Sequence, residues 1–234
     1  MKISVIILCF NESKNLKYLI SQSKKLIKLK NIEIIFVDNG STDNSNKILK
    51  KIPKSKYIKV KFVKKNIGYG YGILSGLNVA NGDIIGWTHG DDLDFFDKMK
   101  TILKTKFHYK YFFLKGYRVG KRPLIDTFFS YGFNIVSSFF LQKKLWEITA
   151  HPTFFSKSLF FKYKKYLPHD FSIDLYLFYF AKKDHYNIKR IKFDYNGRKL
   201  GVSSWNKNFF SKIKLMINYI SKILRLVYLN IFII

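Results

Sequence analysis

Acidic residues are scarce in this chain of 234 residues, which holds 15 Asp and Glu against 43 Lys and Arg. The formal net charge of +28 favours polyanionic partners, among them nucleic acid, anionic lipid headgroups and phosphorylated substrates. The single cysteine, Cys9, excludes an internal disulfide framework and a metal cage made of cysteines alone. No uncharged stretch reaches about 18 residues, so the sequence predicts no membrane-spanning helix.

Apolar residues make up 47% of the chain, which excludes a disordered protein. Apolar runs typical of buried strands cover residues 3–10, 33–38, 57–63 and 84–87, and each precedes a stretch with helical spacing. The later part predicts strands at 110–116 and 188–194, helices over 124–146 and about 169–183, and a loop with a short helix over 151–164. This order predicts an α/β domain over residues 1–208, with a mostly parallel central sheet and flanking helices.

The stretch from Ile32 to Asp43 places a carboxylate where an α/β sheet binds its ligands. An apolar run ends at Asp38, and the turn formers at positions 39–41 lead into the next helix. Ligands of open α/β sheets bind where strands end and helices begin. A carboxylate there can accept hydrogen bonds from a base or a ribose. The alternative is that Asp38 only caps its own turn.

A second polar cluster follows the apolar run that ends at Trp87. His89 precedes acidic residues at positions 91, 92, 94 and 97. This combination suits a hard divalent cation that also holds phosphates, and the alternative is a solvated acidic turn that caps the next helix. Upstream, glycines at positions 68, 70 and 72 match neither a Walker loop nor a dinucleotide fingerprint. They predict close approach of the backbone to a ligand.

Two apolar segments are candidates for membrane contact. Residues 124–146 are rich in aromatic side chains and form either a core helix or a helix in a membrane interface. The tail, residues 209–234, has helical spacing and no acidic residue, and its cations are Lys212, Lys214, Lys222 and Arg225. Such a basic amphipathic helix favours an anionic membrane surface. We therefore expect a peripheral protein on the cytoplasmic, inner face of the cell membrane.

Several motifs, taken together, resemble those of one enzyme family. They are Ile6–Glu12 at an opening nucleotide-binding strand, Val37–Asp43 as a nucleoside-binding signature, His89–Asp91 at the place of an Asp-x-Asp motif, the basic segment Lys115–Arg122, the segment His169–Tyr176, and Arg198–Trp205. Over residues 2–206 the chain resembles family 2 glycosyltransferases of the GT-A fold. It is most similar to the branch of polyprenyl- and dolichol-phosphate sugar transferases. The first Asp of the Asp-x-Asp motif is replaced by His89, which departs from the family's pattern.

The resemblance implies an inverting transfer of a sugar from a nucleotide-sugar donor. Its nucleotide-binding residues would be Asn11, Glu12, Asp38, Gly40, Ser41 and Asp91. Mg²⁺ or Mn²⁺ would be held on the diphosphate by Asp91 with His89 or Asp92. A hydroxyl acceptor would need a base, for which Asp174 and Asp170 are the candidates. A lipid phosphate needs no strong base, and the residues that would hold it are Arg118, Arg122 and Arg198.

The acceptor implied by the resemblance is lipid-linked, either a polyprenyl phosphate or a growing cell-surface glycan. Two other functions compete with this one. The histidine at position 89 suggests an inactive GT-A scaffold, and the net charge suggests a nucleic-acid-binding protein. Against nucleic acid, the acidic clusters lie at the strand ends where the ligand should bind, and no nucleic-acid-binding motif is recognised. We therefore expect no nucleic-acid partner.

Overall fold

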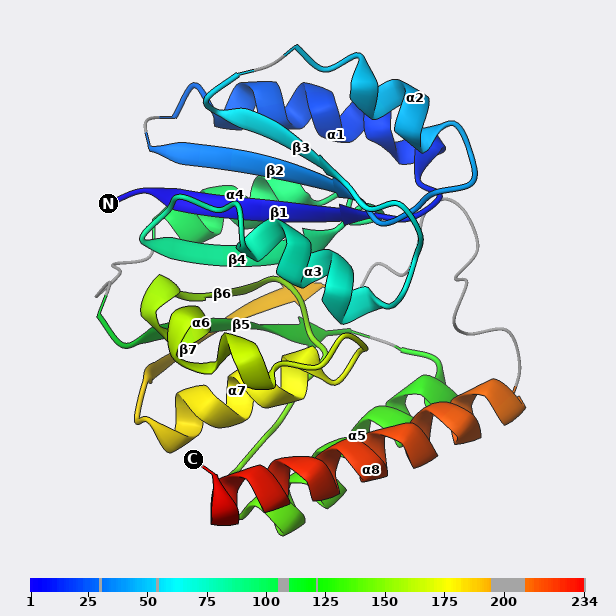
Figure 1. Cartoon of the computed structure of the whole chain (residues 1–234), viewed down its shortest axis with the longest axis vertical. Helices are drawn as coiled ribbons and strands as arrows, with labels where there is room; N and C mark the ends of the chain where they lie inside the picture. The colour runs from blue at the N-terminus through cyan, green and yellow to red at the C-terminus, as the bar shows by residue number, and fades with distance from the viewer. Residues whose placement is uncertain (30, 54, 105–109, 121, 195–208, 234) are drawn as a thin grey trace.

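A seven-stranded sheet with the strand order β3-β2-β1-β4-β6-β5-β7 forms the centre of the molecule (Figure 1). The computed structural model describes all residues except 30, 54, 105–109, 121, 195–208 and 234, and gives only the backbone of residues 209–215. The strands are β1 (Ile3–Cys9), β2 (Ile32–Asp38), β3 (Ile58–Phe62), β4 (Ile84–His89), β5 (Phe112–Val119), β6 (Thr153–Ser156) and β7 (Asn187–Asp194). The first four pair in parallel, as the sequence predicted.

Helices cover both faces of the sheet, because the central strands are apolar on both sides. Every residue of β1 and β2 is buried. Val5 and Ile7 face one core with α1 (Ser13–Leu26), α2 (Ser45–Lys50) and α4 (Phe95–Leu103). Ile6 and Leu8 face a second core with α3 (Tyr69–Leu77), α6 (Lys157–Tyr163) and α7 (Ile173–Lys183). A short 3₁₀ helix, Lys164–Tyr166, follows α6. The alternation of inward residues therefore divides the apolar side chains between two layers.

Strand β6 differs from the prediction, which placed only a loop and a short helix over residues 151–164. Its four residues pair antiparallel with β4 and three of them pair antiparallel with β5, so the sheet is mixed rather than purely parallel. A strand of this length is too short to show a period of two along the sequence. It also joins β5 and β7, which pair in parallel, to the four parallel strands β1 to β4.

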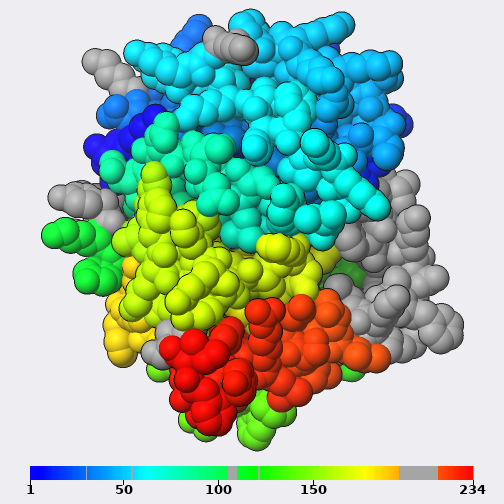
Figure 2. Space-filling view, viewed as in Figure 1, coloured from blue at the N-terminus to red at the C-terminus, as the bar shows by residue number. Residues whose placement is uncertain are grey.

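Two long helices lie side by side at one end of the molecule (Figures 1 and 2). They are α5 (Leu124–Leu141) and α8 (Phe209–Phe232), and the rings of Phe133 and Tyr219 meet between them at 4.1 Å. The outer face of α5 is apolar and open, with Phe128 74% exposed and Phe139 75% exposed. By length and composition α5 could cross a membrane, and it is the one such helix among the described residues. The sequence predicted no spanning helix, because Asp126 interrupts this segment near its start.

One face of helix α8 packs into the core that also contains α7. Tyr219, Ile223, Leu226 and Leu229, three or four positions apart, are buried with the side chains of α7. The hydroxyl of Tyr176 on α7 donates to the backbone oxygen of Lys222 at 2.9 Å. The division of the chain at residue 208 stays a prediction, since the residues before α8 lie outside the described part.

Candidate active site

Hydrogen bonds join the loops after β1 and β2 at the carboxyl ends of these strands. Asn11, in the left-handed region with φ of 58°, accepts the Thr42 backbone N–H at its side-chain oxygen at 2.8 Å, and its own N–H donates to Ser41 Oγ at 3.0 Å. Asp38 is 1% exposed and accepts from the Ser41 N–H at 3.0 Å and from Asn46 Nδ2 at 2.8 Å. Asp38 therefore does cap its own turn. Each of its oxygens has a second lone pair for a ligand.

Acidic side chains converge at these strand ends although the chain as a whole is strongly basic. Their negative charge acts on the thiol of Cys9, the last residue of β1. Burial raises the pKa of Cys9 well above its ordinary value, and the nearby carboxylates raise it further. These carboxylates belong to Glu12, Asp38, Asp91 and Asp43. Such a cluster would repel a free nucleoside diphosphate, so binding one here requires a cation in addition.

Glu12 and Gly40, both predicted to bind nucleotide, lie in the same pair of loops. Glu12 is 7% exposed, and its carboxylate accepts from Asn15 Nδ2 at 2.5 Å. Gly40 has φ of 75°, and a Cβ added there would lie 2.5 Å from the backbone nitrogen of Asn66. The loop before α3 therefore closes over the turn after β2.

The end of β4 offers two donors for a divalent cation. His89 Nδ1 lies 3.8 Å from Asp91 Oδ1, and both side chains are partly exposed. Bonds of roughly 2.0–2.2 Å from each donor span that separation, so one cation can bind both. Asp92 is engaged elsewhere, since it accepts from Thr88 Oγ1 at 2.6 Å and from Lys98 Nζ at 2.6 Å. His89 and Asp91 are thus the better-placed pair of the three predicted ligands.

No group of three or more His, Cys, Asp or Glu side chains that could hold a metal occurs within the described part of the chain. A two-donor site still fits Mg²⁺ or Mn²⁺, because such ions commonly bind through one or two protein ligands and take the rest from substrate phosphates and water. The protein donors found here therefore suit a cation that arrives with a diphosphate.

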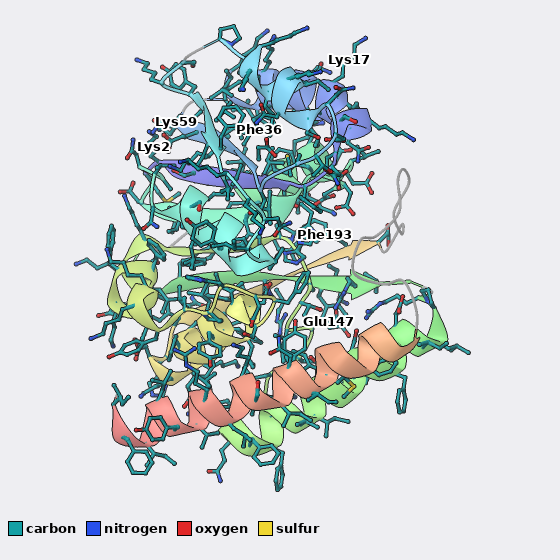
Figure 3. All side chains as sticks on the ribbon, turned by 45° about the vertical axis from the view of Figure 1, so that its right-hand side comes forward. Lys2, Lys17, Phe36, Lys59, Glu147 and Phe193 are labelled. Carbon is teal, nitrogen blue, oxygen red and sulfur yellow. The ribbon has the colours of Figure 1, made fainter. Side chains whose placement is uncertain are left out.

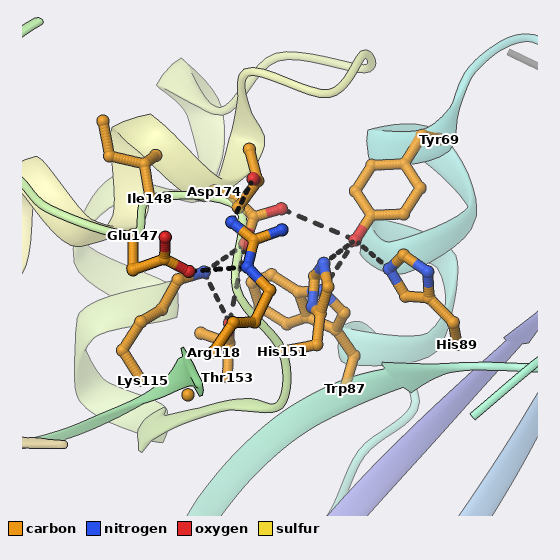
Figure 4. A network of polar contacts seen from close by, with 12 residues as sticks. Tyr69, Trp87, His89, Lys115, Arg118, Glu147, Ile148, His151, Thr153 and Asp174 are labelled. Atoms are coloured by element: carbon orange, nitrogen blue, oxygen red, sulfur yellow. Dashed lines mark hydrogen bonds and ion pairs between the residues drawn. The ribbon is translucent and has the colours of Figure 1, made fainter. Parts of the chain in front are cut away.

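A buried ion pair lies on the β5 side of the site (Figure 4). Lys115, on β5, is 0% exposed and contacts Asp174 of α7, which is 2% exposed. Lys115 Nζ also donates to Thr153 Oγ1 at 2.8 Å. Burial lowers the pKa of Lys115 to about 8, although Asp174 acts in the opposite direction. Asp174 is the residue predicted as catalytic base, and its Oδ1 is held by this contact.

Asp170, the second candidate base, lies on the loop before α7. It accepts from the Ser172 backbone N–H at 3.0 Å and pairs with Lys222 of α8 at 3.2 Å. Burial favours a higher pKa for Asp170, but the hydrogen bonds from Ser172 and the charge of Lys222 outweigh it and lower the pKa. A carboxylate with a lowered pKa is a weaker base. Asp170 therefore lies in surroundings that weaken it as a base.

Tyr69 is a central residue of the site that the motifs did not indicate. Its hydroxyl oxygen lies 3.0 Å from Trp87 Nε1, 3.0 Å from His89 Nε2 and 3.4 Å from His151 Nε2 (Figure 4). It also donates to Asp174 Oδ2 at 3.5 Å. Tyr69 lies among the glycines at the start of α3, where only the glycines drew attention in the sequence.

The glycines near Tyr69 pack closely against another part of the chain. A Cβ at Gly70 would lie 2.5 Å from the backbone oxygen of Pro168, and Gly68 lies against His169. The Tyr71 N–H donates to the backbone oxygen of His169 at 3.0 Å. The approach of this backbone to a ligand therefore stays a prediction, and the contact seen in the structure is with the loop before α7.

Two of the three predicted phosphate-binding arginines share one carboxylate. Arg118 Nε donates to Glu147 at 2.5 Å, and Arg122 Nη1 donates to its other oxygen at 3.3 Å. Glu147 lies between the sheet and the α5–α8 pair (Figure 3). Arg122 Nη2 reaches Ser130 on α5 at 2.9 Å. Two guanidinium groups pair with the single carboxylate of Glu147, so this set of three side chains carries one net positive charge. Arg198 lies outside the described residues.

Comparisons with known proteins show the family and the fold of this chain. The sequence model described as Glycosyl transferase family 2 matches residues 4–164. An undecaprenyl-phosphate 4-deoxy-4-formamido-L-arabinose transferase of Yersinia enterocolitica is 37% identical over 89 residues, and one of Proteus mirabilis is 33% identical over 88 residues. These alignments cover 36% of this chain and only 27% of each relative.

Solved structures with the same fold include glucosyl-3-phosphoglycerate synthase from Mycobacterium tuberculosis. Its complex with Mn²⁺, UDP-glucose and phosphoglyceric acid superposes with a TM-score of 0.70 at 16% identity, over 97% of this chain and 79% of that chain. The complex with Mn²⁺, UDP and phosphoglyceric acid gives a TM-score of 0.69. At this identity the likeness concerns the fold alone, and it confirms the expected α/β class.

Proposed function

We propose, since this chain belongs to glycosyl transferase family 2, that it transfers a sugar from a nucleoside diphosphate sugar to a lipid-linked acceptor. The observation that carries the proposal is the division of the site into two halves. The ends of β1, β2 and β4 gather acidic side chains, whereas Arg118 and Arg122 supply positive charge beside α5. A cation-bound nucleotide fits the first half, and an anionic acceptor fits the second.

The donor would bind at the loops after β1 and β2, with its diphosphate toward the end of β4. Asn11, Glu12, Gly40 and Ser41 shape these loops, and Asp38 would accept a hydrogen bond from the nucleoside. Mg²⁺ or Mn²⁺, held by Asp91 and His89, would offset negative charge on the leaving diphosphate. Relatives of the same fold have been crystallised with Mn²⁺ and UDP, which supports a divalent cation.

The acceptor that fits best is a lipid phosphate such as polyprenyl phosphate. A phosphate oxygen would attack the anomeric carbon as the bond from that carbon to the diphosphate oxygen breaks, and no proton would have to be removed. This agrees with the lowered pKa of Asp170 and with the contact of Lys115 that engages one oxygen of Asp174. Attack from the face opposite the leaving group would invert the anomeric centre. The curated relatives are named for undecaprenyl phosphate, which supports this class of acceptor.

A polyprenyl phosphate lies in a membrane, so a protein that uses it as acceptor would attach to that membrane. The exposed apolar faces of α5 and α8 would lie on the inner leaflet of the cell membrane. Arg122 touches α5 at Ser130, so a phosphate at the bilayer surface would be close to the arginines. Lys222 of α8 pairs with Asp170, so we expect the exposed apolar side chains of both helices to contribute more to the attachment than this cation.

Transfer of a radiolabelled sugar tests the proposal. The chain is incubated with nucleotide sugars, Mn²⁺ and vesicles that contain undecaprenyl phosphate, and the lipid product is extracted. We expect labelled lipid, and its loss in Asp91→Asn but not in Asp97→Asn, because Asp97 is a surface residue of α4 with an 80% exposed side chain. Absence of nucleotide binding would favour an inactive scaffold. Nucleotide binding with transfer only to saccharides would overturn the lipid acceptor.

A further inference from the structure

The hydroxyl of Tyr69 joins the two halves of the site. It lies within 3.0 Å of both Trp87 Nε1 and His89 Nε2, and 3.5 Å from Asp174 Oδ2 (Figure 4). The residue is 6% exposed, and its ring stacks on Phe171 at 4.6 Å. A buried hydroxyl with several polar neighbours can satisfy them in only a few ways, so the direction of each hydrogen bond can be worked out.

Two of the neighbours have a fixed role. The indole N–H of Trp87 can only donate, so it donates to the Tyr69 oxygen. The ionised Asp174 can only accept, and its Oδ1 is already engaged by Lys115. Its Oδ2 accepts from Tyr69, and buried carboxylate oxygens are almost always paired with a donor. The single phenol proton therefore points toward Asp174.

His89 must then donate to Tyr69 rather than accept from it. The oxygen of Tyr69 presents only lone pairs to His89 Nε2, so this nitrogen carries the imidazole proton. A neutral imidazole has one N–H, which leaves Nδ1 with a free lone pair. Nδ1 is the nitrogen that faces Asp91 Oδ1 at 3.8 Å.

We infer that Tyr69 is a positioning residue, which fixes the tautomer of His89 so that Nδ1 is presented with Asp91 to a divalent cation. The inference rests on the cation site of the proposed function. It gives a reason for the histidine at position 89, where the family's motif has an aspartate. An imidazole can replace a carboxylate as a metal ligand only with its lone pair toward the ion, and a hydrogen bond to the other nitrogen secures that orientation.

The ring of His151 limits the movement of His89 from the other side. The two ring centres are 4.0 Å apart. His151 Nε2 makes a longer contact of 3.4 Å with the Tyr69 oxygen. His89 is thus held by a hydrogen bond at Nε2 and by packing against its ring, while Nδ1 remains on the side of Asp91.

Nitrogen NMR of the wild-type chain without metal tests the tautomer directly. The chain has only five histidines, so long-range proton–nitrogen spectra of their rings at about pH 8 contain few signals. The signals of His89 are identified as those that disappear in the variant His89→Gln. We expect protonation at Nε2. Protonation at Nδ1 would overturn the inference. This measurement needs neither activity nor bound cation.

Substitution Tyr69→Phe tests the consequence for the cation. Mn²⁺ binding in the presence of UDP, followed by the electron spin resonance of free Mn²⁺, should weaken by about 10–100-fold, as for other residues that orient a ligand. Tyr71→Phe is the control on the same helix, since the ring of Tyr71 packs on His169. Unchanged Mn²⁺ affinity in a folded Tyr69→Phe chain would overturn the positioning role. Failure of the wild type to bind Mn²⁺ would instead overturn the cation site, while the tautomer is decided by the NMR spectra.

Discussion

The buried pair of Lys115 and Asp174 should show itself in the pH dependence of stability. Lys115 has an ordinary pKa of 10.5, which burial lowers to about 8 in the folded chain. Between these two values the folded state binds fewer protons than the unfolded state, so stability rises with pH through this window. The cost of burying the ammonium is fully present below about pH 8 and is relieved as the pH rises. The full difference corresponds to about 3 kcal/mol at about 1.4 kcal/mol per tenfold change.

The substitution Lys115→Met removes this titration while keeping a side chain of similar length. At about pH 7 the variant should lose about 3–5 kcal/mol, because Asp174 is then buried without its partner. Between about pH 7 and about pH 9.5 the wild type should gain about 2 kcal/mol relative to the variant. Urea unfolding followed by tryptophan fluorescence measures both curves below the range in which the buried tyrosines ionise. Parallel curves would refute the lowered pKa of Lys115.

Two further predictions concern the nucleotide and the membrane. Asp38→Ala should weaken nucleoside diphosphate binding by about tenfold or more in calorimetry, since a hydrogen bond to a charged group contributes roughly 1.5–3 kcal/mol. The control Asn46→Ala removes only a protein donor to Asp38 and should have the smaller effect. Equal affinities of the two variants would contradict the assignment. Phe128→Ser on α5 should lower binding to anionic vesicles by about tenfold or more, because burial of one Phe contributes roughly 1.5–3 kcal/mol. The control Phe161→Ser changes an exposed Phe on α6 and should leave this binding unchanged. Equal losses in the two variants would argue against α5 as the site of attachment.

The first half of the fold could be predicted because its strands are apolar on both faces and end in turn formers. That pattern located β1, β2 and β4 and, with them, Asp38 and Asp91 at the strand ends. The resemblance to family 2 glycosyltransferases, drawn from these same motifs, is confirmed by the match over residues 4–164. The residue roles within the site stay predictions.

The remainder of the site could not be predicted because it forms only through tertiary contacts. Tyr69 lies among glycines, and Glu147 lies in a loop with φ of 50°, so neither belongs to a motif. Lys115 was included in a basic segment, and nothing local indicates that it is buried against Asp174. Strand β6, which contributes Thr153, is too short for its pattern to be distinguished from a loop. Partners far apart in the sequence leave no periodic signal.

The packing of the α3 glycines on the loop before α7 has a consequence for how the chain folds. Tyr69 and Asp174 are 105 positions apart, so this contact closes a long loop of chain. Contacts of such high sequence separation form late, because the entropy of the intervening chain must be lost first. During synthesis, the first three strands and their helices emerge well before residues 168–170. The amino-terminal half therefore cannot fix the position of Tyr69 by itself, and the end of β4 beside Tyr69 acquires its final shape only when the loop before α7 has packed against it.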